Sequence, residues 1–288
     1  MPRRRVTLVA LAGVMALALG PPGLATAGGG GSEAYRAALH LSRTIGVRPS
    51  SSPAELRAIR YVAARFRAAG LRASIIGFDV PGRGRSHDVI GVYDTPHSCL
   101  RIAMAHIDSS PAGRGANDNA SGTGVVTALA DGMQVVKPTC DVWLAANGAE
   151  ERFYTRHPDH LGSQALVRRV RKLGRARDLR LALDLDEVGI TRNFWLRSRE
   201  PEARPDVEGA IVKAARAVGV TVRWVRDSGS GNSDHREFER AGLPAAVLEG
   251  WGAEDPCREL ACDRPGRLDR IALARAQRTA EGVLRRRP

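Results

Sequence analysis

Three apolar runs of this chain each end in side chains of the kind that bind metal ions. Each run has the length and apolar content of a buried strand in a parallel sheet. The carboxyl ends of parallel strands meet at one edge of a sheet, where crevices bind ligands, so side chains far apart in the sequence can converge there. The runs and their polar ends are Leu100 to Met104 before His106 and Asp108, Val142 to Ala146 before Glu150 and Glu151, and Leu181 to Leu185 before Asp186.

Helical and strand patterns alternate along the chain. Ser52-Pro53-Ala54-Glu55 is typical of a helix start, and apolar residues then recur at helical spacing up to Gly70, which predicts a helix over 53–69. The alternation predicts an α/β fold with a mostly parallel central sheet and helices on both faces. We expect further helices over 120–135 and 163–173, and strands over 73–78, 89–93, 100–106, 141–146 and 180–184, with short strands near 193 and 221.

The first 27 residues have the features of a signal peptide. Arg3 to Arg5 form a positive start, Val6 to Leu19 form a short apolar run, and Ala25-Thr26-Ala27 has the form of a cleavage site. An uncleaved membrane anchor is the less favoured alternative, because the apolar run is short and Gly20-Pro21-Pro22 ends it. We therefore expect a secreted protein that has no membrane contact after cleavage, with a signal peptide over 1–27, a Gly-rich spacer over 28–34 and one domain over 35–288.

The formal net charge of +13 is carried almost entirely by arginine, since only three of the 44 basic residues are lysines. Such a bias, with abundant alanine and glycine, is typical of a GC-rich genome and does not by itself indicate nucleic-acid binding. The arginines over 168–180 are interpreted as the solvated face of a helix. We expect no nucleic-acid partner.

An exported chain favours disulfides over free thiols. Cys99 and Cys140 each precede an expected strand by one residue. Neighbouring strands lie about 4.8 Å apart, so level strand starts would allow a disulfide between these two residues. Cys257 and Cys262 are close together in a loop rich in Pro, Asp and Arg, where a short bridge would fix irregular chain. We predict both bridges, with four buried free thiols as the alternative.

Two further pieces belong to the same sheet edge, since Asn117-Asp118-Asn119 and Ser233-Asp234-His235 each lie in a small-residue loop before a helix. Four carboxylates gathered there would repel one another unless cations neutralised them. Histidine and carboxylate ligands without cysteine suit a catalytic zinc site with open positions. Two zinc ions that share one carboxylate need five protein ligands. The candidate set is His106, Asp118, Glu150, Glu151, Asp186 and His235.

The order and spacing of these motifs resemble the co-catalytic di-zinc exopeptidases of the bacterial leucyl aminopeptidase and aminopeptidase S type. The resemblance runs from about Leu41 to Leu284 and implies the αβα sandwich of that family. The motifs that carry it are Ile45 to Pro49, His106-Ile107-Asp108, Gly115 to Gly122, Gly148-Ala149-Glu150-Glu151, Asp186 to Gly189, and Ser233-Asp234-His235 followed by Phe238 and Ala241 to Pro244. The Cys257 to Asp263 segment also resembles a disulfide-closed loop of secreted members.

The resemblance implies a role for each candidate. Asp108 would orient the imidazole of His106, and Glu150 would be the general base. Asp184 competes with Asp186 as a ligand, but the Glu-Val-Gly that follows favours Asp186. The implied metal ligands are His106 and Asp186 for one zinc, Glu151 and His235 for the other, and Asp118 as the bridge between them.

The chain departs from the family pattern at two places. Glu259 stands where many relatives have a histidine, so any contact that this histidine makes at the rim is in doubt. Residues Arg152 to Leu161 intervene before Gly162-Ser163, which usually follow the Glu-Glu motif almost at once. His157 and His160 of this insertion have ligand spacing, but the flanking Pro158 and Asp159 favour a solvated loop.

The leading hypothesis is a secreted, monomeric zinc aminopeptidase with two zinc ions, acting on peptides with a free N-terminus. A serine hydrolase is disfavoured because the chain has no Gly-x-Ser-x-Gly motif, and a thermolysin-like enzyme because it has no His-Glu-x-x-His motif. Two alternatives remain, a glutaminyl-cyclase-like acyltransferase and a non-catalytic secreted domain on the same fold.

Overall fold

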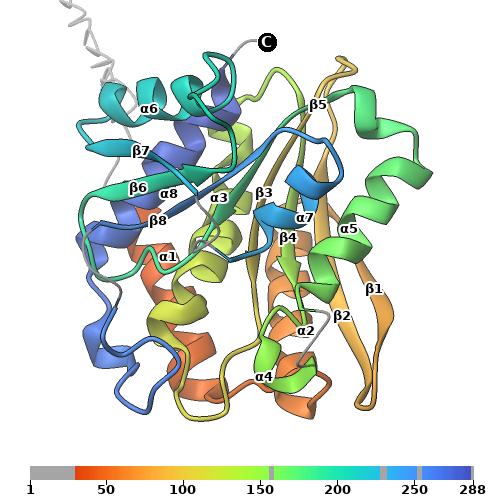
Figure 1. Cartoon of the computed structure of the whole chain (residues 1–288), viewed down its shortest axis with the longest axis vertical. Coiled ribbons are helices and arrows are strands. Elements are labelled where there is room, and N and C mark those ends of the chain that lie inside the picture. Colours follow the sequence, from red (N-terminus) through yellow and green to blue (C-terminus); the bar gives the residue numbers. More distant parts are fainter. Residues whose placement is uncertain (1–29, 156–158, 228–231, 252–254, 287–288) are drawn as a thin grey trace, which may run out of the picture.

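The computed structural model describes residues 30–155, 159–227, 232–251 and 255–286 (Figure 1). The predicted signal peptide over 1–27 lies outside the described residues. Within them, no helix combines the length and apolar character that a membrane span requires.

One sheet of eight strands runs through the molecule, in the order β1-β2-β4-β3-β5-β8-β6-β7 (Figure 1). The strands β4, β3, β5 and β8 at its centre are parallel neighbours, and β6 and β7 also pair in parallel. The strands are β1 (Arg72–Val80), β2 (Gly84–Tyr93), β3 (Leu100–His106), β4 (Asp141–Asn147), β5 (Leu179–Leu185), β6 (Phe194–Ser198), β7 (Val222–Arg226) and β8 (Ala245–Gly250).

The prediction of a mostly parallel sheet is only partly right, because β1–β2, β2–β4 and β6–β8 are antiparallel. The tight connection from Val80 to Gly84 is the reason for the first of these pairs, since so short a link can join only antiparallel neighbours. The parallel centre is the part that positions the three polar strand ends.

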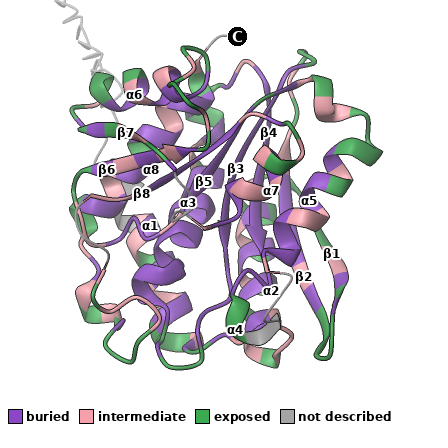
Figure 2. Ribbon diagram, viewed as in Figure 1, coloured by how far each residue is buried: buried purple, intermediate pink, exposed green. Residues whose placement is uncertain are grey.

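Helices cover both faces of the sheet, as predicted, and Figure 2 shows the buried strands between them. Alternate residues of β3 point to opposite sides. Ala103 and Ala105 join a core with α1, α2, α3, α6 and α8, whereas Ile102 and Met104 pack with α5 and α7. The helices are α1 (Gly30–Leu39), α2 (Pro53–Ala68), α3 (Gly122–Val136), α4 (Arg152–Thr155), α5 (Leu161–Lys172), α6 (Glu208–Ala217), α7 (His235–Arg240) and α8 (Arg270–Arg285).

Helix α1 lies where the Gly-rich spacer over 28–34 was expected. The helix begins at Gly30, and its buried residues Ala34, Ala37 and Ala38 are small enough for close packing. A Cβ on Gly124 of α3 would lie 2.6 Å from the carbonyl oxygen of Ala34, so α1 and α3 approach backbone to backbone. Tertiary packing rather than the composition of the segment explains this helix.

The start of α2 is connected to the functional edge of the sheet. Ser52 caps the helix by accepting a hydrogen bond from the Glu55 N–H at 3.1 Å. The buried Glu55 carboxylate in turn accepts hydrogen bonds from the Ser86 hydroxyl at 2.6 Å and from the Ala149 N–H at 3.2 Å. Burial raises the pKa of Glu55 to about 8, with the negative charge of Asp108 adding to the effect. Glu55, the last residue of the predicted Ser-Pro-Ala-Glu helix start, thus also holds the segment that leads to Glu150.

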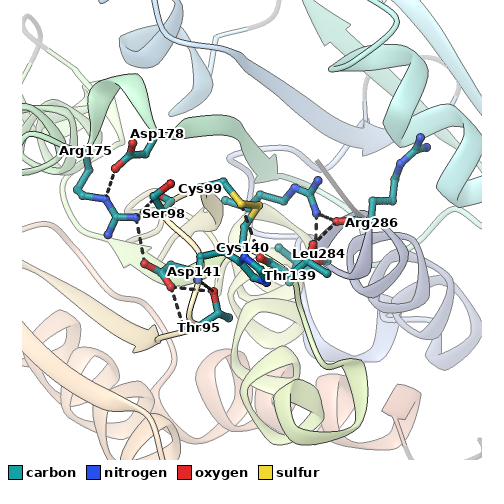
Figure 3. The surroundings of a disulfide bond; sticks show 12 residues. Thr95, Ser98, Cys99, Thr139, Cys140, Asp141, Arg175, Asp178, Leu284 and Arg286 are labelled. Carbon is teal, nitrogen blue, oxygen red and sulfur yellow. Dashed lines mark hydrogen bonds and ion pairs between the residues drawn. A yellow bond between two sulfur atoms is a disulfide. The ribbon is translucent and has the colours of Figure 1, made fainter.

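Both predicted disulfides are present. Cys99 and Cys140 lie directly before β3 and β4, whose starts are level because Leu100 pairs with Asp141, and their Cα atoms are 4.8 Å apart (Figure 3). Cys257 and Cys262 close a short loop with a Cα distance of 5.3 Å. The first bridge ties the amino ends of two central strands, at the opposite edge of the sheet from their polar ends.

The two bridges should differ in their effect on stability because they close chain segments of 41 and 5 residues in sequence separation. We expect the C99A/C140A double variant to lose about 4 kcal/mol of unfolding free energy and the C257A/C262A variant about 2 kcal/mol, on the chain-entropy account of disulfides. Guanidinium unfolding curves would measure both values. An equal or larger loss for the short loop would contradict the expectation.

Candidate active site

A cleft lies at the carboxyl edge of the central strands, where the sequence predicts a site. Five predicted residues line it, and further charged and aromatic side chains complete its wall. The predicted residues are His106, Asp118, Glu150, Glu151 and Asp186, and the additional ones include Arg152, Glu187, Trp195, Arg197, Glu249, Trp251, Asp255, Arg258 and Glu259.

His106, at the end of β3, faces two carboxylates from different parts of the chain. Its Nε2 atom lies 3.2 Å from Oδ1 of Asp118 and 3.5 Å from Oδ1 of Asp186. One potential ligand atom from each of His106, Asp118 and Glu151 lies within 4.8 Å of the other two. These residues therefore form a set of buried donors of the kind that holds a zinc ion.

Asp108 lies on the other side of the same imidazole, with Oδ1 at 3.7 Å from Nδ1 of His106. Its carboxylate also accepts hydrogen bonds from the Ser50 hydroxyl at 2.7 Å and from the N–H groups of Glu150 and Glu151 at 3.1 and 3.2 Å. Burial favours its neutral form, but His106 and these hydrogen bonds outweigh burial and lower the pKa of Asp108. A buried anion thus holds both the histidine and the Glu-Glu backbone.

The loop that carries Asp118 is held from the opposite side by Asp263. The Asp263 carboxylate accepts hydrogen bonds from the N–H groups of Asn117 at 2.9 Å and Asp118 at 3.1 Å. The side-chain oxygen of Asn117 accepts a hydrogen bond from the Gly189 N–H at 2.9 Å, just after β5. These contacts fix the Asp118 loop between the end of β5 and the loop closed by the Cys257–Cys262 bridge.

The structure separates Asp186 from its competitor Asp184. Asp186 follows the last residue of β5 and lines the cleft, whereas Asp184 is fully buried within the strand. The Asp184 carboxylate faces His235 and accepts a hydrogen bond from its backbone N–H at 3.1 Å. Asp186 is therefore the residue of the pair that lines the cleft together with the other predicted ligands His106, Asp118 and Glu151.

His235 is not among the described residues that line the cleft. Its side chain is fully buried at the start of α7, with Nδ1 3.5 Å from Asp184 and Nε2 3.9 Å from Asp227. Burial opposes the imidazolium charge, but these two carboxylates outweigh burial and raise the pKa of His235 to about 9. The described contacts of His235 are thus with Asp184 and Asp227, and its role as a metal ligand stays a prediction.

The ligand set implied by the resemblance leaves out several charged residues of the cleft, among them Glu187, Arg258 and Glu259. Glu187 forms an ion pair with Arg258, and both line the cleft together with Glu259. Glu187 directly follows a predicted ligand, and the other two lie in the loop between Cys257 and Cys262. The departure from the family pattern at Glu259 was the one available signal for this side of the site.

Repulsion among the carboxylates is strong. Burial and the neighbouring charges of Asp118 and Glu150 raise the pKa of Glu151 well above its usual range. Burial and Asp118 also raise the pKa of Glu187 and of Glu259. The Oε1 atom of Glu151 is buried and has no hydrogen-bond partner in the described part of the chain. An unpaired buried oxygen amid like charges fits a site that binds divalent cations.

The insertion over Arg152–Leu161 begins with the short helix α4 beside the cleft. His157 lies outside the described residues. The expectation of a solvated loop is wrong for His160, which is fully buried with Nε2 3.3 Å from Oε1 of Glu150. The reason is that its backbone N–H donates to the carbonyl oxygen of Glu150 at 3.1 Å, which turns the end of the insertion inward.

Known proteins with related sequence or structure include peptidases. Residues 88–284 match the model of "Peptidase family M28". The chain is 28% identical over 265 residues to leupeptin-inactivating enzyme 1 from Streptomyces exfoliatus. The matched region covers 82% of this chain and 58% of that relative, so the chain spans about three fifths of the relative's length.

The structural neighbours share the fold at low sequence identity. The zinc aminopeptidase BSAP from Bacillus subtilis superimposes with a TM-score of 0.78 at 16% identity, covering 88% of this chain and 93% of that one. A glutaminyl cyclase from Bacteroides thetaiotaomicron superimposes with a TM-score of 0.77 at 22% identity, covering 90% and 98%. The fold is therefore shared by enzymes of both kinds that the sequence suggested. Because the family match spans residues 88–284, more than half of the sequence, the chain belongs to peptidase family M28.

Proposed function

We propose that this chain is an exported zinc-dependent aminopeptidase that removes residues from the N-terminus of peptides. The observation that carries the proposal is the cluster of His106, Asp118 and Glu151 in a cleft that Glu150 also lines. Family membership supports peptide hydrolysis. Two disulfides and the signal-like residues 1–27 support export to an oxidising compartment.

The residues present fit two zinc ions that share Asp118. His106 and Asp186 would hold one ion, because Nε2 of His106 lies 3.5 Å from Asp186 and 3.2 Å from the shared Asp118. Glu151 would hold the other, with its unpaired buried oxygen as the donor. When bound, the two ions would supply Lewis-acid polarisation of the scissile carbonyl and stabilisation of developing negative charge.

Glu259 takes the place of His235 in this proposal. It lines the same cleft as Asp118 and Glu151, and burial and the charge of Asp118 raise its pKa. The Cys257–Cys262 bridge and the hydrogen bond from the Ser110 hydroxyl to the Glu259 carbonyl oxygen, at 3.1 Å, hold its backbone. A carboxylate at this position can complete the ligand set of the second zinc.

Glu150 is the proposed general base. Its backbone is held by Asp108 and its side chain lines the cleft next to the proposed ligands. Burial raises the pKa of Glu150, while His106 and His160 oppose the rise. A carboxylate with a raised pKa can take a proton from the attacking water and pass it to the leaving amine.

The charges of the cleft favour a substrate with a free α-ammonium group. Eight carboxylates but only three arginines line the cleft within the described residues. Arg197 and Arg258 already form ion pairs with Glu249 and Glu187. A terminal carboxylate would therefore meet negative charge, whereas an ammonium group would find carboxylate partners.

The first test separates the base from the ligand. Replacing Glu150 by Ala should leave two zinc ions bound and lower kcat by a factor of about 100 or more, as expected for loss of a general base. Replacing Glu151 by Ala should lower the zinc content as well as kcat, because Glu151 is a proposed ligand. Metal analysis of both purified variants, with kcat on an aminoacyl chromophore, measures this. Loss of zinc in E150A with retention in E151A would reverse the two roles.

The second test concerns Glu259 and His235. We expect E259A to bind one zinc ion instead of two, and E259H to recover the second ion because imidazole is a zinc ligand. The matched control is H235N, which should keep both ions because His235 faces Asp184 and Asp227 instead of the cleft. Zinc titration calorimetry gives the stoichiometry. A missing ion in H235N, with two in E259A, would restore the original assignment.

The reaction itself is tested with one peptide in two forms. The free peptide should lose residues in order from its N-terminus, and a chelator should stop this, because the reaction needs the metal. The N-acetylated peptide should resist, since it has no ammonium group. Mass spectrometry follows the products. Trimming of the blocked peptide from its C-terminus, or cyclisation of an N-terminal glutamine without cleavage, would contradict the proposal.

A further inference from the structure

His160 is a buried titratable residue next to the proposed base, and the proposed function gives it no role. It lies at the end of the insertion over Arg152–Leu161, which departs from the family pattern. We propose that His160 is a positioning residue that holds the Glu150 carboxylate in the orientation needed for proton transfer. The inference rests on the proposed function, because it assumes that Glu150 is the base.

The imidazole of His160 is held between two carboxylates. Its Nε2 atom lies 3.3 Å from Oε1 of Glu150, and its Nδ1 atom lies 3.4 Å from Oε1 of Glu237 on α7. Glu237 itself accepts a hydrogen bond from Arg240 at 2.5 Å. A contact on each ring nitrogen fixes the plane of the ring, so the edge that faces Glu150 has a defined position.

The backbone around His160 is also fixed. The N–H groups of His160, Leu161 and Gly162 donate to the carbonyl oxygens of Glu150, Ala149 and Gly148 at 3.1, 3.0 and 3.0 Å. These bonds join the end of the insertion to the segment that carries the proposed base. A Cβ on Gly162 would lie 2.4 Å from the Gly148 carbonyl oxygen, so the two segments approach as closely as their backbones allow. Movement of the His160 ring relative to Glu150 is therefore restricted from both ends.

The Glu150 side chain needs such a partner. Asp108 binds only its backbone N–H, and several rotatable bonds separate that point from the carboxylate. The ion-pair contact with His160 lies at Oε1 of Glu150, so it restricts the orientation of the carboxylate by charge attraction. Burial opposes the imidazolium charge, but Glu150 and Glu237 outweigh burial and raise the pKa of His160 to about 10, which supports a protonated ring that forms ion pairs with both carboxylates.

A role confined to stability predicts different behaviour from a positioning role. A buried side chain that only holds the fold would affect unfolding, zinc content and substrate binding together. A positioning residue affects the step in which Glu150 moves a proton, so kcat should fall while KM and zinc content stay the same. The conservative replacement Gln can place an amide N–H near the position of Nε2 and should restore part of the effect.

The experiment compares H160L, H160Q and S163A with the unchanged enzyme. We expect H160L to lower kcat about tenfold to a hundredfold, the size expected when a catalytic group is misplaced by about 1 Å, without a change in KM or in two bound zinc ions. H160Q should recover most of the loss. S163A is the matched control, because its buried hydroxyl donates only to the His160 carbonyl oxygen, at 3.1 Å, and its kcat should not change.

A second variant covers the case in which H160L does not fold. E237Q keeps His160 but weakens the contact at Nδ1, so kcat should fall by a smaller factor, again at unchanged KM. Unchanged kcat in both H160Q and E237Q, or equal losses in kcat and zinc content, would overturn the positioning role. A zinc-loaded parent enzyme that cleaves no peptide would instead overturn the proposed function and this inference with it.

Discussion

Repulsion among buried carboxylates at one edge of the sheet is the constraint on which the other features of this structure depend. Glu151, Glu187 and Glu259 all have raised pKa values because burial and the charge of Asp118 act on them together. Such a cluster is stable only if each group is neutralised, protonated or hydrogen-bonded. The surrounding residues supply part of this compensation, and bound cations would supply the rest.

A buried arginine, Arg48, offsets part of the negative charge beside the cleft. Arg48 is fully buried, and its guanidinium donates to the carbonyl oxygens of Ile107 at 2.8 Å and Gly115 at 3.0 Å. Burial lowers the pKa of Arg48 to about 10, so it remains charged near neutral pH beside Asp108 and Asp263. This one residue joins the segment after β3 to the loop of Asp118, which explains why a motif far from the ligands belongs to the same pattern.

The sequence was sufficient for the centre of the molecule. Apolar runs in β3 and β4 predicted both strands, and the polar residues after three strands predicted that His106, Glu151 and Asp186 would lie in one cleft. Sequence could not place the His235 side chain, because a small-residue loop before a helix does not reveal which way the first residue of that helix points. The antiparallel pair β1–β2 was missed because the link from Val80 to Gly84 was not identified as a tight turn.

The insertion after the Glu-Glu motif departs from the family pattern but contacts the site without displacing the residues of the cleft. The three backbone hydrogen bonds from His160, Leu161 and Gly162 bring the chain back to the segment that ends at Glu150, so the extra residues lie between two fixed points. An insertion of this kind costs only a modest loop-closure entropy. Its last residues are then available to contact the proposed base Glu150, and the buried His160 does so in this chain. Residues that face Glu150 from outside the family motif can therefore set its orientation without changing the ligands.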